Sequence, residues 1–221
     1  MIAQQLISDE INPLKTSDTG LEALNWMSFY KISHMPIVNN KEFLGLISEE
    51  DIYNLNNPAD PIGNHKLSLF RPYVYYNQHI YEILQTASSL KLTVVPVIDE
   101  ENLYMGLITM VELMHQFSKF TAVDSNGGII VLEINQNEYS LSEISQIVES
   151  NDSKILSLYL ATQPESMMME LVIKVNVSDV TSILQTFRRF NYEVKASYQE
   201  VDKNEEIMNS RYELLMKYLN I

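Results

Sequence analysis

The chain has 221 residues, with 15 basic and 29 acidic side chains, a formal charge of −14 and a pI of about 4.6. This balance disfavours nucleic-acid binding, because the neutralisation of phosphates needs clustered Lys and Arg. No apolar run approaches the ~18 residues of a membrane helix, so we expect a soluble, cytoplasmic protein without membrane contacts. The absence of cysteine excludes disulfides, thiolate metal sites and thiol catalysis.

The first half of the chain repeats itself at an offset of about 60 residues. Residues 35–38 (MPIV) align with residues 95–98 (VPVI). After one inserted residue, residues 44–48 (LGLIS) align with residues 105–109 (MGLIT). The match predicts two structural repeats, at about residues 1–60 and 61–122.

Each repeat predicts the same order of elements. Apolar residues with a period of 3.6 indicate helices over 21–32 and 80–90, and Thr19 with Glu22 predicts a capping box. Strands that begin at Pro36 and Pro96 should follow, then strands at 43–47 and 104–108, and then helices at 49–55 and 111–117. A βαββα unit of this size cannot bury both faces of its sheet alone, so the two repeats should pack on each other.

Each repeat has a helix, then the pattern h-P-[VI]-[VI], then G-h-h-[ST]-x-x-[DE] and a short helix, where h is an apolar residue. This arrangement, present twice, resembles a pair of CBS domains, which is also called a Bateman module. The resemblance covers roughly residues 1–120 of a first domain that we place at residues 1–122. It implies an α/β fold in which the cleft between the repeats binds an adenosine ligand. AMP, ADP, ATP (with or without Mg²⁺) and S-adenosylmethionine are the ligands that it implies, in a non-catalytic regulatory protein.

The resemblance also assigns ligand contacts position by position. Asp51 falls where the family binds ribose hydroxyls, Ser48 where it contacts phosphate, and His34 where some relatives place a basic phosphate contact. In the second repeat Thr109 matches Ser48, while Glu112 is one methylene longer than the usual Asp. The predicted nucleotide-binding residues are Asp51, Ser48, His34, Pro36, Thr109, Glu112 and Pro96.

A structural interpretation of the same residues competes with ligand binding. Ser48 with Asp51, and Thr109 with Glu112, fit capping boxes, and spacing alone favours this interpretation. Few basic side chains lie near the motifs, so a monophosphate or an uncharged adenosyl group would fit better than a bare triphosphate. The four histidines lack metal-ligand spacing, and the chain has no P-loop or G-x-S-x-G, so neither a metal site nor a catalytic set is predicted.

The second half of the chain has a different order of elements. Residues 123–128 are small, polar and turn-forming, and predict a linker. Residues 127–200 then predict a strand, a helix capped by Ser140 and Glu143, two strands, a helix and a strand, which is the ferredoxin-like α+β order. This order after a CBS pair resembles an ACT domain, a regulatory module that often binds amino acids. The turn at residues 135–139 lacks the glycine of amino-acid-binding members, which favours a dimerisation or transmission role.

The last residues, 203–221, predict a C-terminal helix with one apolar face. The resemblance implies a homodimer, because both modules usually associate through helices or sheet edges. We therefore expect an adenosine-nucleotide sensor that regulates an unidentified protein. Two alternatives remain open: a ligand-free structural interaction or dimerisation module, and an amino-acid sensor that acts through the ACT-like domain.

Overall fold

The structure is a computed structural model and describes residues 1–66, 69–162 and 166–199. The chain divides into two compact units, Met1–Gln116 (unit 1) and Phe117–Ile221 (unit 2). The predicted C-terminal helix at 203–221 lies outside the described residues. No helix within the described part of the chain has the length and apolar character needed to span a bilayer.

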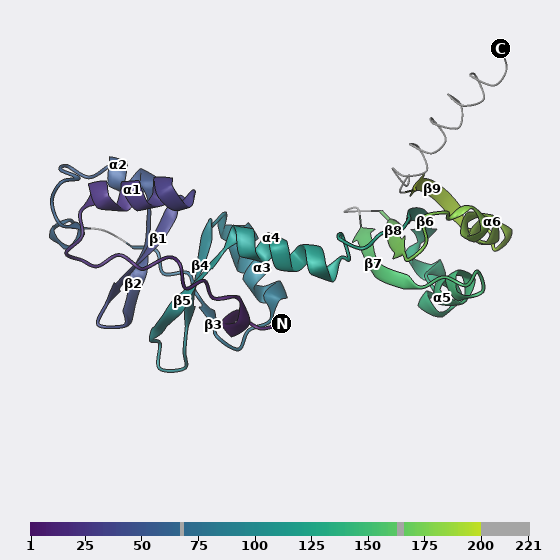
Figure 1. The fold of residues 1–221 in the computed structure, drawn as a ribbon. Helices are drawn as coiled ribbons and strands as arrows, with labels where there is room; N and C mark the ends of the chain where they lie inside the picture. The colour runs from purple at the N-terminus through teal and green to yellow at the C-terminus, as the bar shows by residue number, and fades with distance from the viewer. Residues whose placement is uncertain (67–68, 163–165, 200–221) are drawn as a thin grey trace, which may run out of the picture. The chain divides into compact units, whose positions relative to one another are not determined.

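Unit 1 contains two repeats of similar elements (Figure 1). The first comprises the 3-10 helix η1 (Ala3–Leu6), α1 (Gly20–Tyr30), β1 (His34–Asn39), β2 (Glu42–Ser48) and α2 (Glu49–Tyr53). The second comprises η2 (Ile62–Asn64), β3 (Val74–Tyr75), α3 (Ile80–Leu90), β4 (Val94–Ile98), β5 (Tyr104–Thr109) and α4 (Met110–Phe120), which crosses the boundary between the units.

Strands β1 and β4 begin two residues before the prolines that were predicted to start them. Pro36 pairs with Leu46 inside the antiparallel ladder of β1 and β2, and its carbonyl accepts from Leu14 N on the other side of β1. The N and O atoms of one strand residue point to the same side, so the missing N–H of Pro36 faces Leu14 and the β1–β2 ladder loses no hydrogen bond.

The first strand of the repeat differs between the two copies. In the second repeat, β3 pairs in parallel with β4 through Val74–Val97 and Tyr75–Ile98. In the first repeat, Leu14 forms a single parallel bridge with Ile37, held by hydrogen bonds of 2.8 Å from Leu14 N and to Leu14 O. The expected first strand of the first repeat is therefore reduced to one residue.

The repeats exchange short segments across a common hydrophobic core, and we call these segments straps. The N-terminal strap (residues 7–11) bridges to β5 of the second repeat through Ser8, and the second strap (residues 69–71) bridges to β2 of the first repeat. Gly45 and Gly106 lie where the straps cross, with φ of +150° and +152°. A Cβ on Gly45 would lie 2.7 Å from Leu69 Cβ, so the G-h-h-[ST] motif needs glycine for a close backbone crossing.

Unit 2 is a four-stranded antiparallel sheet with strand order β7-β8-β6-β9. Its elements are β6 (Ile129–Asn135), η3 (Gln136–Glu138), α5 (Leu141–Glu149), β7 (Ile155–Thr162), β8 (Met168–Val175), α6 (Thr181–Arg189) and β9 (Glu193–Tyr198). Alternate residues of β6 and β8 share one core with buried side chains of α5 and α6, so both helices cover the same face of the sheet.

One local prediction in unit 2, the capping box at Ser140 and Glu143, needs correction. Ser140 Oγ accepts from Glu143 N at 3.4 Å, but the Glu143 carboxylate accepts from Tyr192 OH at 2.6 Å, so the described contacts form only half of the capping box. Burial and the Glu143 carboxylate raise the pKa of Tyr192 above its usual range. At the start of unit 2, Ser157 Oγ donates to Thr121 O at 2.9 Å and Lys174 Nζ donates to Val123 O at 3.2 Å.

Candidate functional site

The N-terminus of α2 carries the first pair of predicted ligand residues. Ser48 Oγ accepts from Asp51 N at 3.1 Å, and Asp51 Oδ2 accepts from Ser48 N at 2.8 Å and from Ser48 Oγ at 2.7 Å. This is a complete capping box. One carboxylate oxygen of Asp51 is therefore occupied by the helix cap, while the residue itself is exposed.

The equivalent pair at α4 is arranged differently. Thr109 Oγ1 accepts from Glu112 N at 3.2 Å, as Ser48 does in the first repeat. Glu112 Oε1, however, accepts from Gln116 Nε2 at 2.6 Å, one turn further along the helix. The Glu112 carboxylate is directed along α4 rather than back to the cap. Thr109 and Glu112 are both half-buried.

His34 lies between the repeats. Its Nδ1 is 3.0 Å from Thr93 Oγ1, and the same hydroxyl accepts from Ser33 N at 3.0 Å. Burial lowers the pKa of His34 below 6.5, against the opposing effect of Asp51 and Glu49. A neutral imidazole at pH 7 is a poor partner for a phosphate, so this geometry suits a structural contact with Thr93.

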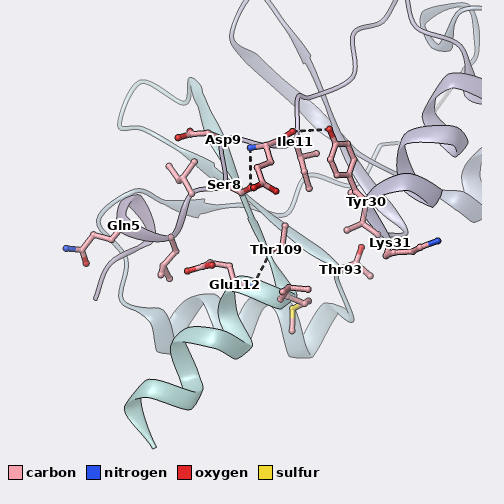
Figure 2. Close-up of a pocket in the computed structure, with 15 residues that line it drawn as sticks. Gln5, Ser8, Asp9, Ile11, Tyr30, Lys31, Thr93, Thr109 and Glu112 are labelled. Atoms are coloured by element: carbon pink, nitrogen blue, oxygen red, sulfur yellow. Dashed lines mark hydrogen bonds between the residues drawn. The ribbon is translucent and has the colours of Figure 1, made fainter. Parts of the chain in front are cut away.

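The structure has a cleft of about 640 Å³ at the start of α4. Figure 2 shows that its walls come from the N-terminal strap, the C-terminal end of α1 and the first turn of α4. The lining residues are Gln5, Leu6, Ile7, Ser8, Asp9, Glu10, Ile11, Tyr30, Lys31, Ile32, Thr93, Thr109, Met110, Val111 and Glu112.

Two of the seven predicted ligand residues, Thr109 and Glu112, line this cleft. Ser48, Asp51 and His34 do not, although His34 contacts Thr93 on its wall. Pro36 and Pro96 are buried within β1 and β4. The strap and Tyr30 were missed by the sequence reasoning, because only the tertiary fold brings them to the second repeat.

The strap wall of the cleft is fixed by specific contacts. Ser8 N donates to Leu107 O at 2.9 Å, and Tyr30 OH donates to Glu10 O at 3.0 Å, as Figure 2 shows for Tyr30. Trp26, the only tryptophan in the chain, stacks on the Tyr30 ring at a centroid distance of 5.9 Å and an angle of 21°. Hydroxyl, aromatic and apolar groups meet in one concave site, which suits the binding of a small organic molecule.

Comparison with known proteins supports a CBS domain in unit 1. Residues 4–56 match the CBS domain family. The chain is 25% identical over 134 residues to inosine-5'-monophosphate dehydrogenase of Methanocaldococcus jannaschii. That match covers 58% of this chain and 26% of the relative, so the chain spans about a quarter of the length of the curated relative that it matches.

Solved structures similar to this chain match about half of its length. A CBS domain pair/ACT domain protein from Thermotoga maritima matches with 21% identity and a TM-score of 0.47, over 53% of this chain and 96% of that chain. CBSX2 in complex with AMP matches with 14% identity and a TM-score of 0.46, over 52% of this chain and 95% of that chain.

Proposed function

We propose that the protein is a non-catalytic regulatory protein that binds an adenosine nucleotide or another adenosyl compound in the cleft of unit 1. The observation that carries the proposal is the cleft itself, because two motif residues of a duplicated CBS-like unit, Thr109 and Glu112, lie on its wall. The match of residues 4–56 to the CBS domain family supports the same assignment.

The cleft has the size and chemistry that a nucleoside needs. Its volume of about 640 Å³ falls within the range typical of small-molecule sites. Ile11 and Ile32 offer an apolar wall for a base next to the Tyr30 ring. Thr93, Thr109 and Glu112 offer hydroxyl and carboxylate groups for the hydroxyls of a ribose. We place the ligand here rather than beside Asp51, because Glu112 lines the cleft and Asp51 does not, and one carboxylate oxygen of Asp51 is occupied by its helix cap.

Thermal unfolding of the full chain with AMP, ADP, ATP, S-adenosylmethionine and adenosine tests the proposal. A ligand present at about 100 times its dissociation constant should stabilise the protein by about 2.7 kcal/mol. Binding should also change the fluorescence of Trp26, because its stacking partner Tyr30 lines the cleft. No response to any adenosyl compound at millimolar concentration would favour the ligand-free interaction module instead.

A pair of variants locates the site. Glu112→Ala should weaken the ligand-induced shift, and Asp51→Ala should retain it, with each shift measured against the same variant without ligand. The comparison with the unliganded variant matters because Asp51→Ala also removes a helix cap. The opposite outcome, a shift lost only in Asp51→Ala, would move the ligand to the first repeat.

We propose further that unit 2 is an ACT-like domain with a ferredoxin-like fold. The support is its order of elements, its strand order β7-β8-β6-β9 and the position of both helices on one face of the sheet. Amino-acid sensing is not favoured. The pocket beside η3 has a volume of about 360 Å³ and is lined by Glu133, Glu138, Glu143 and Glu193 with no basic side chain, so it would repel an amino-acid carboxylate.

The proposed role of unit 2 is dimerisation or transmission to a regulated protein. Homodimer formation gains support from large exposed apolar side chains on helices of unit 1, such as Trp26, Phe29 and Tyr81. Sedimentation of the full chain with and without ligand tests the homodimer, and a monomer under both conditions would contradict it.

A further inference from the structure

We infer that the cleft of unit 1 selects adenosyl ligands in which the part beyond the nucleoside carries a positive charge, such as a sulfonium or ammonium group, over nucleotides that carry phosphates. The inference rests on the proposed adenosyl site and assigns its selectivity to the charge of the cleft wall. The residues that decide it are Asp9, Glu10 and Glu112.

The charged lining of the cleft is acidic. Three carboxylates, those of Asp9, Glu10 and Glu112, face one ammonium group, that of Lys31, which gives the lining a formal charge of −2. Figure 2 shows Glu112 and Lys31 on opposite sides of the cleft. The chain as a whole carries a charge of −14, so its long-range field also repels anions and attracts cations.

The fold itself uses two of the backbone N–H groups at the helix N-terminus beside the cleft. The first turn of α4 would ordinarily attract phosphate through free backbone N–H groups. Here Met110 N donates to Thr93 O at 3.3 Å, and Glu112 N donates to Thr109 Oγ1 at 3.2 Å. The Glu112 carboxylate already stands in the first turn, where it supplies the negative charge that the helix dipole favours.

Hydrogen bonds at the cleft wall hold the backbone of Glu10 and the side chain of Glu112. The backbone of Glu10 is fixed twice, because its carbonyl accepts from Tyr30 OH and its N–H donates to Ser8 Oγ at 3.4 Å. Glu112 is half-buried and is oriented by Gln116. The Glu112 charge is held at a partly buried wall and is screened less than the charges of the exposed Asp9 and Glu10, so it should contribute most to the discrimination between ligands.

Isothermal titration of the full chain against matched ligands tests the inference. S-adenosylmethionine and S-adenosylhomocysteine share the adenosyl and amino-acid parts and differ by one methyl group and one positive charge. S-adenosylmethionine should bind about tenfold tighter than S-adenosylhomocysteine, from the interaction of one charge with nearby carboxylates in a partly solvated site. Adenosine should bind tighter than AMP, and AMP tighter than ATP. These differences should shrink as the salt concentration rises.

Variants assign the selectivity to the cleft wall. The double variant Glu10→Gln with Glu112→Gln should reduce the ratio between S-adenosylmethionine and S-adenosylhomocysteine from about ten to near one. Adenosine affinity should fall as well, because Glu112 also faces the ribose, so the ratio of the two affinities is the measurement that tests the charge. Glu101→Gln removes one exposed carboxylate in the β4–β5 turn, outside the cleft lining, and is the matched control. It should leave the ratio unchanged.

Three outcomes would overturn the inference. The first is tighter binding of AMP or ATP than of adenosine, and the second is equal affinity for the two S-adenosyl compounds. Either of these two outcomes would still be consistent with an adenosyl-binding site in the cleft. The third is no binding of any compound, adenosine included, which would remove the proposed function together with the inference.

Discussion

The two repeats of unit 1 share a motif but use its carboxylate differently. In the first repeat, Asp51 bonds back to the Ser48 cap, and in the second, Glu112 bonds forward to Gln116. Side-chain length does not explain the difference, because Glu22 reaches back to its own cap, Thr19, at the start of α1. The residue one turn further along the helix is the distinguishing feature: Gln116 offers an amide to Glu112, whereas Leu55 stands at the same distance from Asp51.

A duplicated motif can therefore keep its cap hydroxyl in both copies and place its carboxylate on the wall of a cleft in only one. The repeats also differ in their first strand, which is the pair β3–β4 in one copy and a bridge at Leu14 in the other. The repeats are therefore equivalent in their central hairpin and helix cap, and unequal at their edges. Each of the following experiments compares one position with its counterpart.

The largest effect is expected at the glycines where the straps cross. In Gly45→Ala the new Cβ would meet Leu69 Cβ at 2.7 Å and Phe70 O at 2.9 Å. Backbone strain at positive φ adds to this overlap, so the free energy of unfolding should fall by about 4 kcal/mol. Urea unfolding of the full chain measures the change.

The matched change in the second repeat is Gly106→Ala, which should cost about half as much because the new Cβ meets only side-chain atoms of Ile7, whereas at Gly45 it also meets a backbone oxygen. Combining it with Ile7→Ala should recover part of the loss. Equal losses at Gly45 and Gly106 would show that strain, and not the strap contact, decides both.

The next largest effect is expected at the first strand. Leu14 is 2% exposed, and Leu14→Ala should lower the free energy of unfolding by about 3 kcal/mol through lost burial and a residual cavity. The counterpart Val74→Ala, at a residue that is 1% exposed, should cost about 2 kcal/mol because the deleted side chain is smaller. A negligible loss at Leu14 would mean that the single bridge does not anchor the first repeat, and denaturant titration decides this.

A smaller effect is expected at the helix caps. Ser48→Ala removes a hydroxyl that accepts from Asp51 N and donates to Asp51 Oδ2, and should cost about 1.5 kcal/mol. Thr109→Ala removes one described cap bond and should cost about 1 kcal/mol. Thermal unfolding of both variants without ligand measures the difference, and a larger loss at Thr109 would reverse the comparison of the caps.

The smallest effect is a pH dependence from His34, whose counterpart in the second repeat is Val94. Burial lowers the pKa of His34 in the folded protein, so the unfolded chain binds a proton first as the pH falls below 6.5. The stability contribution is complete above pH 6.5 and is lost as the pH falls through the folded pKa. As the pH falls from 6.5 to the folded pKa of His34, the free energy of unfolding should fall more steeply in the wild type than in His34→Asn. Identical slopes in chemical denaturation would contradict a buried, neutral His34.

Much of the fold could be predicted from local pattern. The offset of about 60 residues, the capping box at Thr19 and the helices and strands of both halves follow from residues close together in the chain. Misplaced boundaries have tertiary causes. The strand β1 starts before its proline because the missing N–H of Pro36 faces Leu14 rather than β2. The Glu143 carboxylate does not complete the capping box because it accepts a hydrogen bond from Tyr192, which lies 49 residues away in the chain.

The sequence by itself determined the duplication, the order of elements and the chemistry of the motif residues, because helix caps and strand alternation depend on neighbours within about four residues. Only the tertiary structure decided which copy of the motif faces a cleft. That cleft needs the N-terminal strap, Tyr30 at the end of α1 and Thr109 at the start of α4, which lie roughly 20 to 100 residues apart in the chain and meet only when the two repeats bury a common core.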